Sequence, residues 1–195
     1  MNNKPVYTIG YGTREIDTFL ETLHRYEITY LIDIRSKPFS RYKPDFTKER
    51  LEEHLRQAGI RYVFMGDSLG GRPADPTCYD VEGKVDYAQV AERPFYLAGI
   101  DRLAKAQSQG LSVTVMCSEG KPENCHRSKL IGKSLQQRQI QVAHIDENDT
   151  LIGQGDVLLR HTGGQLSMFG DDMLPTASRK RYRVSRTDPE DEESD

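Results

Sequence analysis

Short apolar runs alternate with amphipathic segments along most of the chain. The runs are rich in Val, Ile, Leu and Tyr, which is typical of buried strands. We expect strands at residues 6–9, 30–34, 62–65, 111–116 and 142–145. Between them, apolar residues recur at helical spacing, as at Ile16, Phe19 and Leu23, and this spacing predicts helices.

Five alternations of strand and helix, with nearly continuous apolar strands, predict a parallel sheet covered by helices on both faces. We therefore expect a single α/β domain over residues 1–150, with a mainly parallel five-stranded sheet flanked by helices. One helix should follow Thr47, and the helical pattern of residues 87–109 should break at Pro94. From residue 151 the periodicity is lost, so residues 151–195 are expected to form an extended tail.

Composition indicates a globular protein of an aqueous compartment. The chain is 36% hydrophobic and 29% charged, and no apolar run reaches the roughly 18–20 residues that span a bilayer. The first residues lack the apolar core of a secretory signal. Three cysteines, an odd number, argue against a disulfide framework. We expect a cytoplasmic protein without membrane association, whose cysteines are thiols, metal ligands or transient redox partners.

Charges of the two signs are segregated near the C-terminal end. The net charge is −3, yet acidic residues dominate the end from Asp188, and a basic run from Arg179 to Arg186 precedes them. A basic segment can hold phosphates electrostatically, although a solvated tail is the simpler interpretation.

Three polar segments directly follow three of the predicted strands. They carry Gly10 and Gly12, Asp33 and Arg35, and Cys117 and Glu119. Ligands of α/β proteins gather at the carboxyl ends of parallel strands. We therefore expect these side chains to surround one depression at that edge of the sheet.

Residues 117–127 carry the highest density of reactive side chains. The segment leaves a strand at Cys117 and enters a helix near Cys125, followed by His126 and Arg127. The N–H groups of a helix start attract anions and lower the pKa of a thiol, and Arg127 adds positive charge. Cys125 is therefore a candidate thiolate, and Glu119 a candidate for proton transfer. The alternative is that Cys125 and His126 only pack and cap the loop.

The spacing of residues in this segment can be compared with three known kinds of site. A cysteine phosphatase places arginine six positions after its nucleophile, but that position after Cys117 is Glu123, which excludes it. A Cys-x-Glu segment matches half of the zinc deaminase signature, whose Cys-x-x-Cys half is missing. Cys117 and Cys125 could hold a metal together with His126 or Cys78. Structural zinc usually takes four ligands, so the metal and cofactor content stays open.

The glycine turn and the second strand each allow two interpretations. Gly10 and Gly12 open like a dinucleotide-binding turn, but the third glycine position is Glu15, which would repel a phosphate. A tight turn that gives a phosphate access to the backbone fits better. Asp33 and Arg35 lie two residues apart and point to the same face, as a ligand-binding pair or as a buried structural ion pair.

A loop that follows the second strand is both basic and aromatic. Its members are Arg35, Lys37, Arg41 and Lys43, interleaved with Phe39, Tyr42 and Phe46. Such a loop can grip phosphates and stack on bases, or it can be an ordinary surface loop with a few packed aromatic side chains.

In combination, these segments resemble the bacterial domain-of-unknown-function family 488. The resemblance rests on residues 8–12 (Thr-Ile-Gly-Tyr-Gly), 31–36 with Pro38, Phe39 and Ser40, 69–71 (Leu-Gly-Gly), and Cys117-x-Glu119 with Cys125-His-Arg127. It covers roughly residues 6–146 and implies a shared α/β fold and a shared site.

A second, independent resemblance lies in the predicted tail. Residues 165–169 resemble the peptide by which bacterial replication and repair proteins bind the DNA polymerase sliding clamp, commonly Gln-Leu-Ser/Asp-Leu-Phe. The matching residues are Gln165, Leu166 and Phe169 around Ser167, with Met168 in place of a leucine. The resemblance implies clamp binding, and the alternative is an apolar patch that packs on the core.

Together these observations favour an α/β enzyme acting on a phosphate-bearing substrate, a nucleic acid or nucleotide, in DNA repair or defence. The candidate catalytic residues are Cys117, Glu119, Cys125, His126 and Asp33. The candidate anion-binding residues are Gly10, Gly12, Arg35, Arg41 and Arg127. Two alternatives stay open: a non-catalytic module that recognises a nucleotide or nucleic acid, and a thiol redox sensor that uses Cys117 and Cys125.

Overall fold

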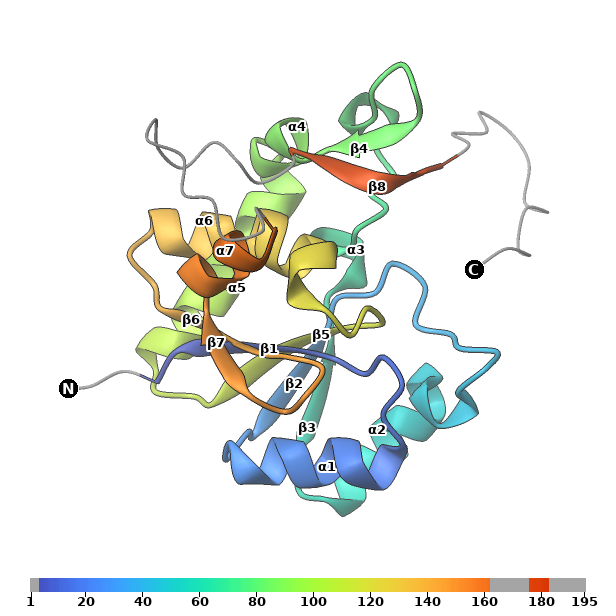
Figure 1. The fold of residues 1–195 in the computed structure, drawn as a ribbon, viewed down its shortest axis with the longest axis vertical. Coiled ribbons are helices and arrows are strands. Elements are labelled where there is room, and N and C mark those ends of the chain that lie inside the picture. Colours follow the sequence, from blue (N-terminus) through green and yellow to red (C-terminus); the bar gives the residue numbers. More distant parts are fainter. Residues whose placement is uncertain (1–3, 162–175, 183–195) are drawn as a thin grey trace.

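Five of the six strands in the central sheet coincide with the apolar runs that predicted them. The computed structural model describes residues 4–161 and 176–182 (Figure 1). The strands are β1 (Val6–Gly10), β2 (Tyr30–Asp33), β3 (Arg61–Phe64), β5 (Val113–Cys117), β6 (Val142–Ile145) and β7 (Leu151–Gly153). Their spatial order is β3-β2-β5-β1-β6-β7, and every neighbouring pair is parallel except β6 and β7. The predicted α/β class and mainly parallel sheet are confirmed.

Most of the helices that connect the strands lie where helical spacing appears in the sequence. The α-helices are α1 (Ile16–Arg25), α2 (Lys48–Gln57), α3 (Gly66–Leu69), α4 (Tyr87–Ala91), α5 (Pro94–Ser108), α6 (Lys133–Gln137) and α7 (Gln154–His161). The shorter turns are η1 (Pro44–Phe46), η2 (Pro76–Cys78), η3 (Pro122–Asn124) and η4 (Arg127–Gly132), of which η4 is π-helical. The break at Pro94 is confirmed: α4 ends at Ala91, and Pro94 starts α5.

The sheet separates two cores, because alternate residues of each strand face opposite sides (Figure 1). On one face, Phe19 of α1 and Leu51 of α2 pack with Leu31 and Met116. On the other face, helices α3 to α6 and turn η4 pack over β2 and β5 on side chains that include Ile32, Ile34, Val113 and Val115. The strands thus present two chemically independent surfaces at the same carboxyl edge.

The ordered chain continues beyond residue 150, where an extended tail was expected. Strand β7 pairs with β6, with Ile152 opposite His144, and Val157 of α7 is fully buried. A further strand, β8 (Ala177–Arg181), pairs antiparallel with β4 (Lys84–Asp86). The expected boundary at 150 is therefore wrong for these elements. The peptide at residues 165–169 and the acidic end lie outside the described residues.

A buried polar network explains why α7 belongs to the fold. His144 on β6 bonds through Nδ1 to the Thr8 hydroxyl and through Nε2 to Gln154 Oε1, both at 2.7 Å. The Gln154 amide in turn donates to the carbonyl oxygen of Ser128 in η4, at 3.1 Å. Burial lowers the pKa of His144 to about 4, so the ring stays neutral and structural. Gln154 thereby ties α7 to both the sheet and η4.

None of the helices in the described ranges combines the length and the apolar character that crossing a membrane requires.

Candidate functional site: a thiol pair around a buried arginine

Two thiols meet where β5 passes into the following turns. Cys117 ends β5, and the chain then turns back through η3, where the N–H of Cys125 donates to the carbonyl oxygen of Pro122 at 3.0 Å. This turn brings the two Sγ atoms to 2.8 Å from each other. Both residues are buried, with 3% of Cys117 and 5% of Cys125 exposed. The pairing agrees with the expectation that both cysteines belong to one cluster.

Arg127 is the organising cation of this cluster and is itself fully buried. Its Nη1 donates to Cys117 Sγ at 3.0 Å and also to the Glu119 carbonyl oxygen, and its Nη2 donates to the Gly120 carbonyl oxygen at 2.7 Å. A side chain at Gly10 would collide with both the Glu119 carbonyl and the Arg127 guanidinium. Glycine at position 10 is therefore required for the β1 end to lie against this loop.

The two thiols have different pKa values, so one stays protonated and donates a hydrogen bond while the other ionises. Burial alone would raise the pKa of Cys125, but the hydrogen bond from Cys117 and the charge and backbone N–H of Arg127 outweigh it and lower the pKa to about 7. Burial and the neighbouring Cys125 raise the pKa of Cys117 well above its usual range. One proton is thus shared by the pair, held by Cys117 and donated towards Cys125.

His126 faces the thiolate with a fixed tautomer. Its Nε2 lies 3.2 Å from the Leu69 carbonyl oxygen, which can only accept, so we assign the ring proton to Nε2. The unprotonated Nδ1 lies 3.6 Å from Cys125 Sγ. Burial lowers the pKa of His126, which keeps the ring neutral. Gly71 leaves space for this ring, because a Cβ there would lie 3.0 Å from Nδ1.

The Glu119 carboxylate points away from the thiols. Its Oε2 forms an ion pair with Arg179 of β8 at 2.8 Å, and both side chains are partly exposed. Only the Glu119 backbone carbonyl approaches the cluster, where Cys117 Sγ lies 3.6 Å away. Its role in proton transfer stays a prediction that this geometry does not favour.

Asp33 and Arg35 lie on the opposite face of the sheet from the thiols. Asp33 is in register with Met116, so both point to the same side, whereas Cys117, the next residue of β5, points to the other. The expectation that all candidate residues surround one depression is therefore not met for Asp33 and Arg35.

These two residues form a closed ion pair of their own. Arg35 Nη2 lies 2.6 Å from Asp33 Oδ2, and Arg35 Nη1 donates to the Phe46 carbonyl oxygen at 2.7 Å. The Tyr62 hydroxyl donates to Asp33 Oδ2 at 2.8 Å. The guanidinium also stacks over the Tyr11 ring, 5.5 Å from its centroid. The alternative of a buried structural ion pair describes this arrangement.

The glycine turn after β1 uses its N–H groups within the protein. Gly12 has a φ of +49°, which favours glycine, and its N–H donates to the Ser118 carbonyl oxygen at 3.0 Å. The N–H of Tyr11 donates to the Cys117 carbonyl oxygen at 3.1 Å. The turn joins β1 to the thiol loop, and these two donors are already occupied. An anion-binding role for Gly10 and Gly12 stays a prediction.

The basic and aromatic loop is exposed in its middle only, because Arg35 belongs to the ion pair with Asp33 and Phe46 is buried beside it. Phe39 and Tyr42 have 68% and 82% of their surface exposed, and Arg41 is exposed between them. Lys43 instead anchors the loop, because its Nζ binds the Arg14 carbonyl oxygen at 2.9 Å and Glu15 at 2.7 Å.

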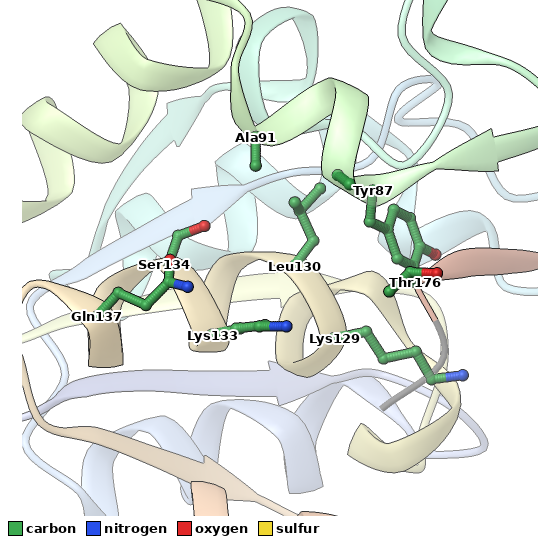
Figure 2. Close-up of a pocket in the computed structure, with 9 residues that line it drawn as sticks. Tyr87, Ala91, Lys129, Leu130, Lys133, Ser134, Gln137 and Thr176 are labelled. Atoms are coloured by element: carbon green, nitrogen blue, oxygen red, sulfur yellow. The ribbon is translucent and has the colours of Figure 1, made fainter. Parts of the chain in front are cut away.

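A pocket next to the thiols, mostly apolar and flanked by two lysines, was not foreseen from the sequence. Tyr87 and Ala91 of α4 face Leu130, Lys133 and Ser134 across it, and its further lining residues include Lys129, Gln137 and Thr176 (Figure 2). The signal in the sequence was the pair of lysines four residues apart, one helical turn, in the predicted helix 125–139.

The charge of Cys125 affects the pKa values of two of the pocket residues. Burial raises the pKa of Tyr87, and the neighbouring Cys125 raises it further. Burial and Arg179 lower the pKa of Lys129, while Cys125, Glu119 and Glu123 partly offset them. The pocket and the thiol pair are adjacent, since the N–H of Lys129 donates to the Cys125 carbonyl oxygen at 3.3 Å. Within the described ranges, no group of three or more His, Cys, Asp and Glu side chains is arranged to hold a metal ion.

Comparison with known proteins places this site in a family. No curated protein sequence and no solved structure matches the chain. The family model described as "Domain of unknown function DUF488" matches residues 15–133, more than half of the 195 residues. That range holds the Asp33–Arg35 pair, the thiols, Arg127 and both pocket lysines. The chain therefore belongs to the DUF488 family.

Proposed function

We propose that this chain is an enzyme in which the Cys125 thiolate is the attacking group and the substrate carries phosphate, as a nucleotide or nucleic acid does. The observation that carries the proposal is the buried thiol pair beside a guanidinium: the Sγ atoms lie 2.8 Å apart, and Arg127 Nη1 donates to Cys117 Sγ at 3.0 Å. This environment lowers the pKa of Cys125 to about 7. Because the thiolate is the nucleophilic form of cysteine, a large fraction of Cys125 is reactive at neutral pH. Neutral His126, with its Nδ1 lone pair towards Cys125, is placed to accept the remaining thiol proton.

The pocket beside the thiols supports a phosphate-bearing substrate. Lys129 and Lys133 contribute positive charge, and the ammonium of Lys129 lies near a further cation, Arg179. An anion bound between them would relieve this repulsion and raise the pKa of Lys129 towards its usual range. Phosphate groups are anions that Lys binds as a point charge.

The exposed loop supports nucleic acid as the substrate class. Phe39 and Tyr42 offer aromatic faces to bases, and Arg41 offers charge to the backbone. The same loop would serve a non-catalytic nucleic-acid binding module, which is the second candidate function. Turnover of an oligonucleotide or nucleotide separates the two.

The rate of alkylation against pH tests the proposed nucleophile. Iodoacetamide should label Cys125 with an apparent pKa near 7, below the ordinary value of about 8.5. Inorganic phosphate, a nucleoside monophosphate or a short single-stranded oligonucleotide should slow the labelling, and Lys133→Gln should weaken that protection. Buried Cys78 is the internal control. If Cys125 reacts no faster than Cys78 in the native protein, the proposed nucleophile is refuted.

Oligonucleotide binding tests the loop separately. Phe39→Ala with Tyr42→Ala should weaken binding of a labelled single-stranded oligonucleotide about tenfold or more, since stacking contributes about 1–3 kcal/mol per base. Val81→Ala, another exposed apolar side chain far along the chain, is the matched control. Equal affinity in all variants would remove the loop from the proposal.

The peptide at residues 165–169 adds a proposed partner, on sequence grounds alone. We propose that Gln165, Leu166, Met168 and Phe169 dock on the DNA polymerase sliding clamp. Replacing Gln165, Leu166 and Phe169 with alanine should abolish clamp binding and leave the melting temperature unchanged. A lowered melting temperature would assign the peptide to the core instead.

A further inference from the structure

We propose that Cys117 and Cys125 are an oxidation site at which small hydroperoxides produce a reversible intramolecular disulfide. This goes beyond the proposed function, because the disulfide removes the thiolate on which that function depends. The proposal rests on two geometric features, the short distance between the sulfur atoms and the buried cation beside them. The unequal acidity of the thiols, to which both features contribute, sets the order of the steps.

The distance between the sulfur atoms leaves little movement to be made. The Sγ atoms are 2.8 Å apart, and a disulfide bond is about 2.05 Å long, so closure needs a shift of about 0.8 Å. The two cysteines are connected by the single turn of residues 118–124, which contains η3. Small changes in the side-chain torsions, together with a slight movement of this short connecting segment, can bring the two sulfur atoms that much closer.

The unequal acidity of the thiols assigns the order of the chemical steps. Cys125 is the more acidic thiol and attacks first as the thiolate, whereas Cys117 keeps its proton and acts second. In the first step the Cys125 sulfur attacks one peroxide oxygen, the O–O bond breaks, and a sulfenic acid and hydroxide form. The hydroxide takes up a proton and leaves as water; an organic hydroperoxide releases an alkoxide instead, which leaves as an alcohol.

The second step closes the pair. Cys117 loses its proton, its sulfur attacks the Cys125 sulfur, and the S–O bond breaks as the S–S bond forms. The departing hydroxide takes the Cys117 proton and leaves as water. Two thiols are oxidised by two electrons, and one peroxide is reduced to two molecules of water, so atoms and electrons balance.

Arg127 makes the disulfide easy to reduce again. In the reduced protein its buried guanidinium lies beside the pair: its Nη1 donates to Cys117 Sγ at 3.0 Å, and its backbone N–H donates to Cys125 Sγ at 3.5 Å. A disulfide carries no charge, so oxidation removes the anion from beside this cation. Stabilising the reduced form in this way makes a disulfide more oxidising, and hence more labile towards dithiols.

Hydrogen peroxide is a suitable oxidant for this pair because of its small size. Only 5% of Cys125 is exposed, and hydrogen peroxide can reach a sulfur atom that has so little exposed surface. Cys78 is also buried, but it lies outside the pair and its pKa is raised by burial. It therefore serves as an internal thiol that should not be consumed.

The experiment counts and maps thiols in the full-length native protein. After stoichiometric hydrogen peroxide, two of the three thiols should disappear, and proteolysis should give one peptide linked between Cys117 and Cys125, with Cys78 still alkylated. Dithiothreitol should restore all three thiols. Cys78→Ser should behave like the wild type, and Cys117→Ser should instead accumulate a sulfenic acid that dimedone traps at Cys125.

Three outcomes would overturn the proposal. They are a disulfide that includes Cys78, a disulfide between two chains, and full retention of thiols in the native protein under peroxide that oxidises the urea-unfolded chain. None of these results depends on folding of a variant, since the wild-type map decides them. Failure here would leave the alkylation profile of Cys125 untouched, so the proposed function and this inference fail separately.

Discussion

The two faces of the sheet carry two buried arginines at the same edge, and these arginines are neutralised in different ways. Arg35 faces a carboxylate, Asp33, at 2.6 Å. Arg127 faces backbone carbonyl oxygens and a thiol pair. Asp33 and Arg35 form a closed ion pair that also binds the Phe46 carbonyl oxygen and the Tyr62 hydroxyl, so it is a structural element. The charge of Arg127 helps to lower the pKa of Cys125 to about 7, so the Arg127 cluster changes its charge near neutrality. The difference locates the chemistry on the Cys117 face.

Breaking the fixed pair should give the largest effect. Asp33→Ala leaves Arg35 as an unpaired buried cation and removes the acceptor of the Tyr62 hydroxyl. We expect the free energy of unfolding to fall by about 3–5 kcal/mol, measured by urea denaturation. Asp45→Ala, which breaks the exposed pair with Arg50, should cost less than about 1 kcal/mol. A loss below that value for Asp33→Ala would mean that the pair contributes little to the fold.

A side chain at Gly10 should disturb the other face. Gly10→Ala places a methyl group too close to the Glu119 carbonyl and Arg127. The Glu119 carbonyl belongs to the backbone, so relieving this clash requires a costly backbone shift. We expect a loss of about 3 kcal/mol in unfolding free energy, with a raised pKa of Cys125 in alkylation. Gly155→Ala in α7, where a Cβ meets nothing within 4 Å, is the control. That variant should be neutral or stabilising by less than about 1 kcal/mol. Equal stability of the two variants would contradict the close approach at Gly10.

The smallest expected effect is the pH dependence of stability, and it is the most specific to the thiols. The pKa of Cys125 is about 7 in the folded protein and about 8.5 in an unfolded chain. Between these values the unfolded chain binds more protons, so the unfolding free energy should rise with pH, by about 2 kcal/mol in total. Above about pH 8.5 the raised pKa of Cys117 acts in the opposite direction.

Variants identify the group responsible for that rise. Cys125→Ser should remove it, and Cys78→Ser should keep it, when urea denaturation is repeated at each pH. A wild-type profile that is flat or falls between pH 7 and pH 8.5 would mean that Cys125 is an ordinary buried thiol.

The sequence predicted the strands well, because each is a run of apolar residues that only a covered sheet can bury. It also predicted that Cys117 and Cys125 meet, since a strand end and a following turn lie close in the chain. It could not predict that Asp33 and Cys117 face apart. Side-chain alternation is known within one strand, but the relative phase of two strands depends on their register, which here aligns Asp33 with Met116.

The elements after residue 150 were missed for a different reason. Strand β7 is short and includes Gly153, and α7 contains Gly155, so local preference for regular structure is weak. Contacts with distant residues provide the stability instead, through the bond from Gln154 to His144. Such tertiary contacts leave no periodic pattern in the sequence.

The π-helical turn η4 connects the thiol cluster to the pocket, since it begins at Arg127 and also carries Lys129 and Leu130 of the pocket lining. A π-helical turn holds one residue more than an α-helical turn, and each residue rotates a helix by about 100°. Deleting one residue within η4 would therefore rotate Lys133 and Ser134 out of the pocket while Cys117 and Cys125 keep their places upstream. The extra residue of η4 therefore decides which side chains of α6 line the pocket, while the sulfur pair lies on its N-terminal side.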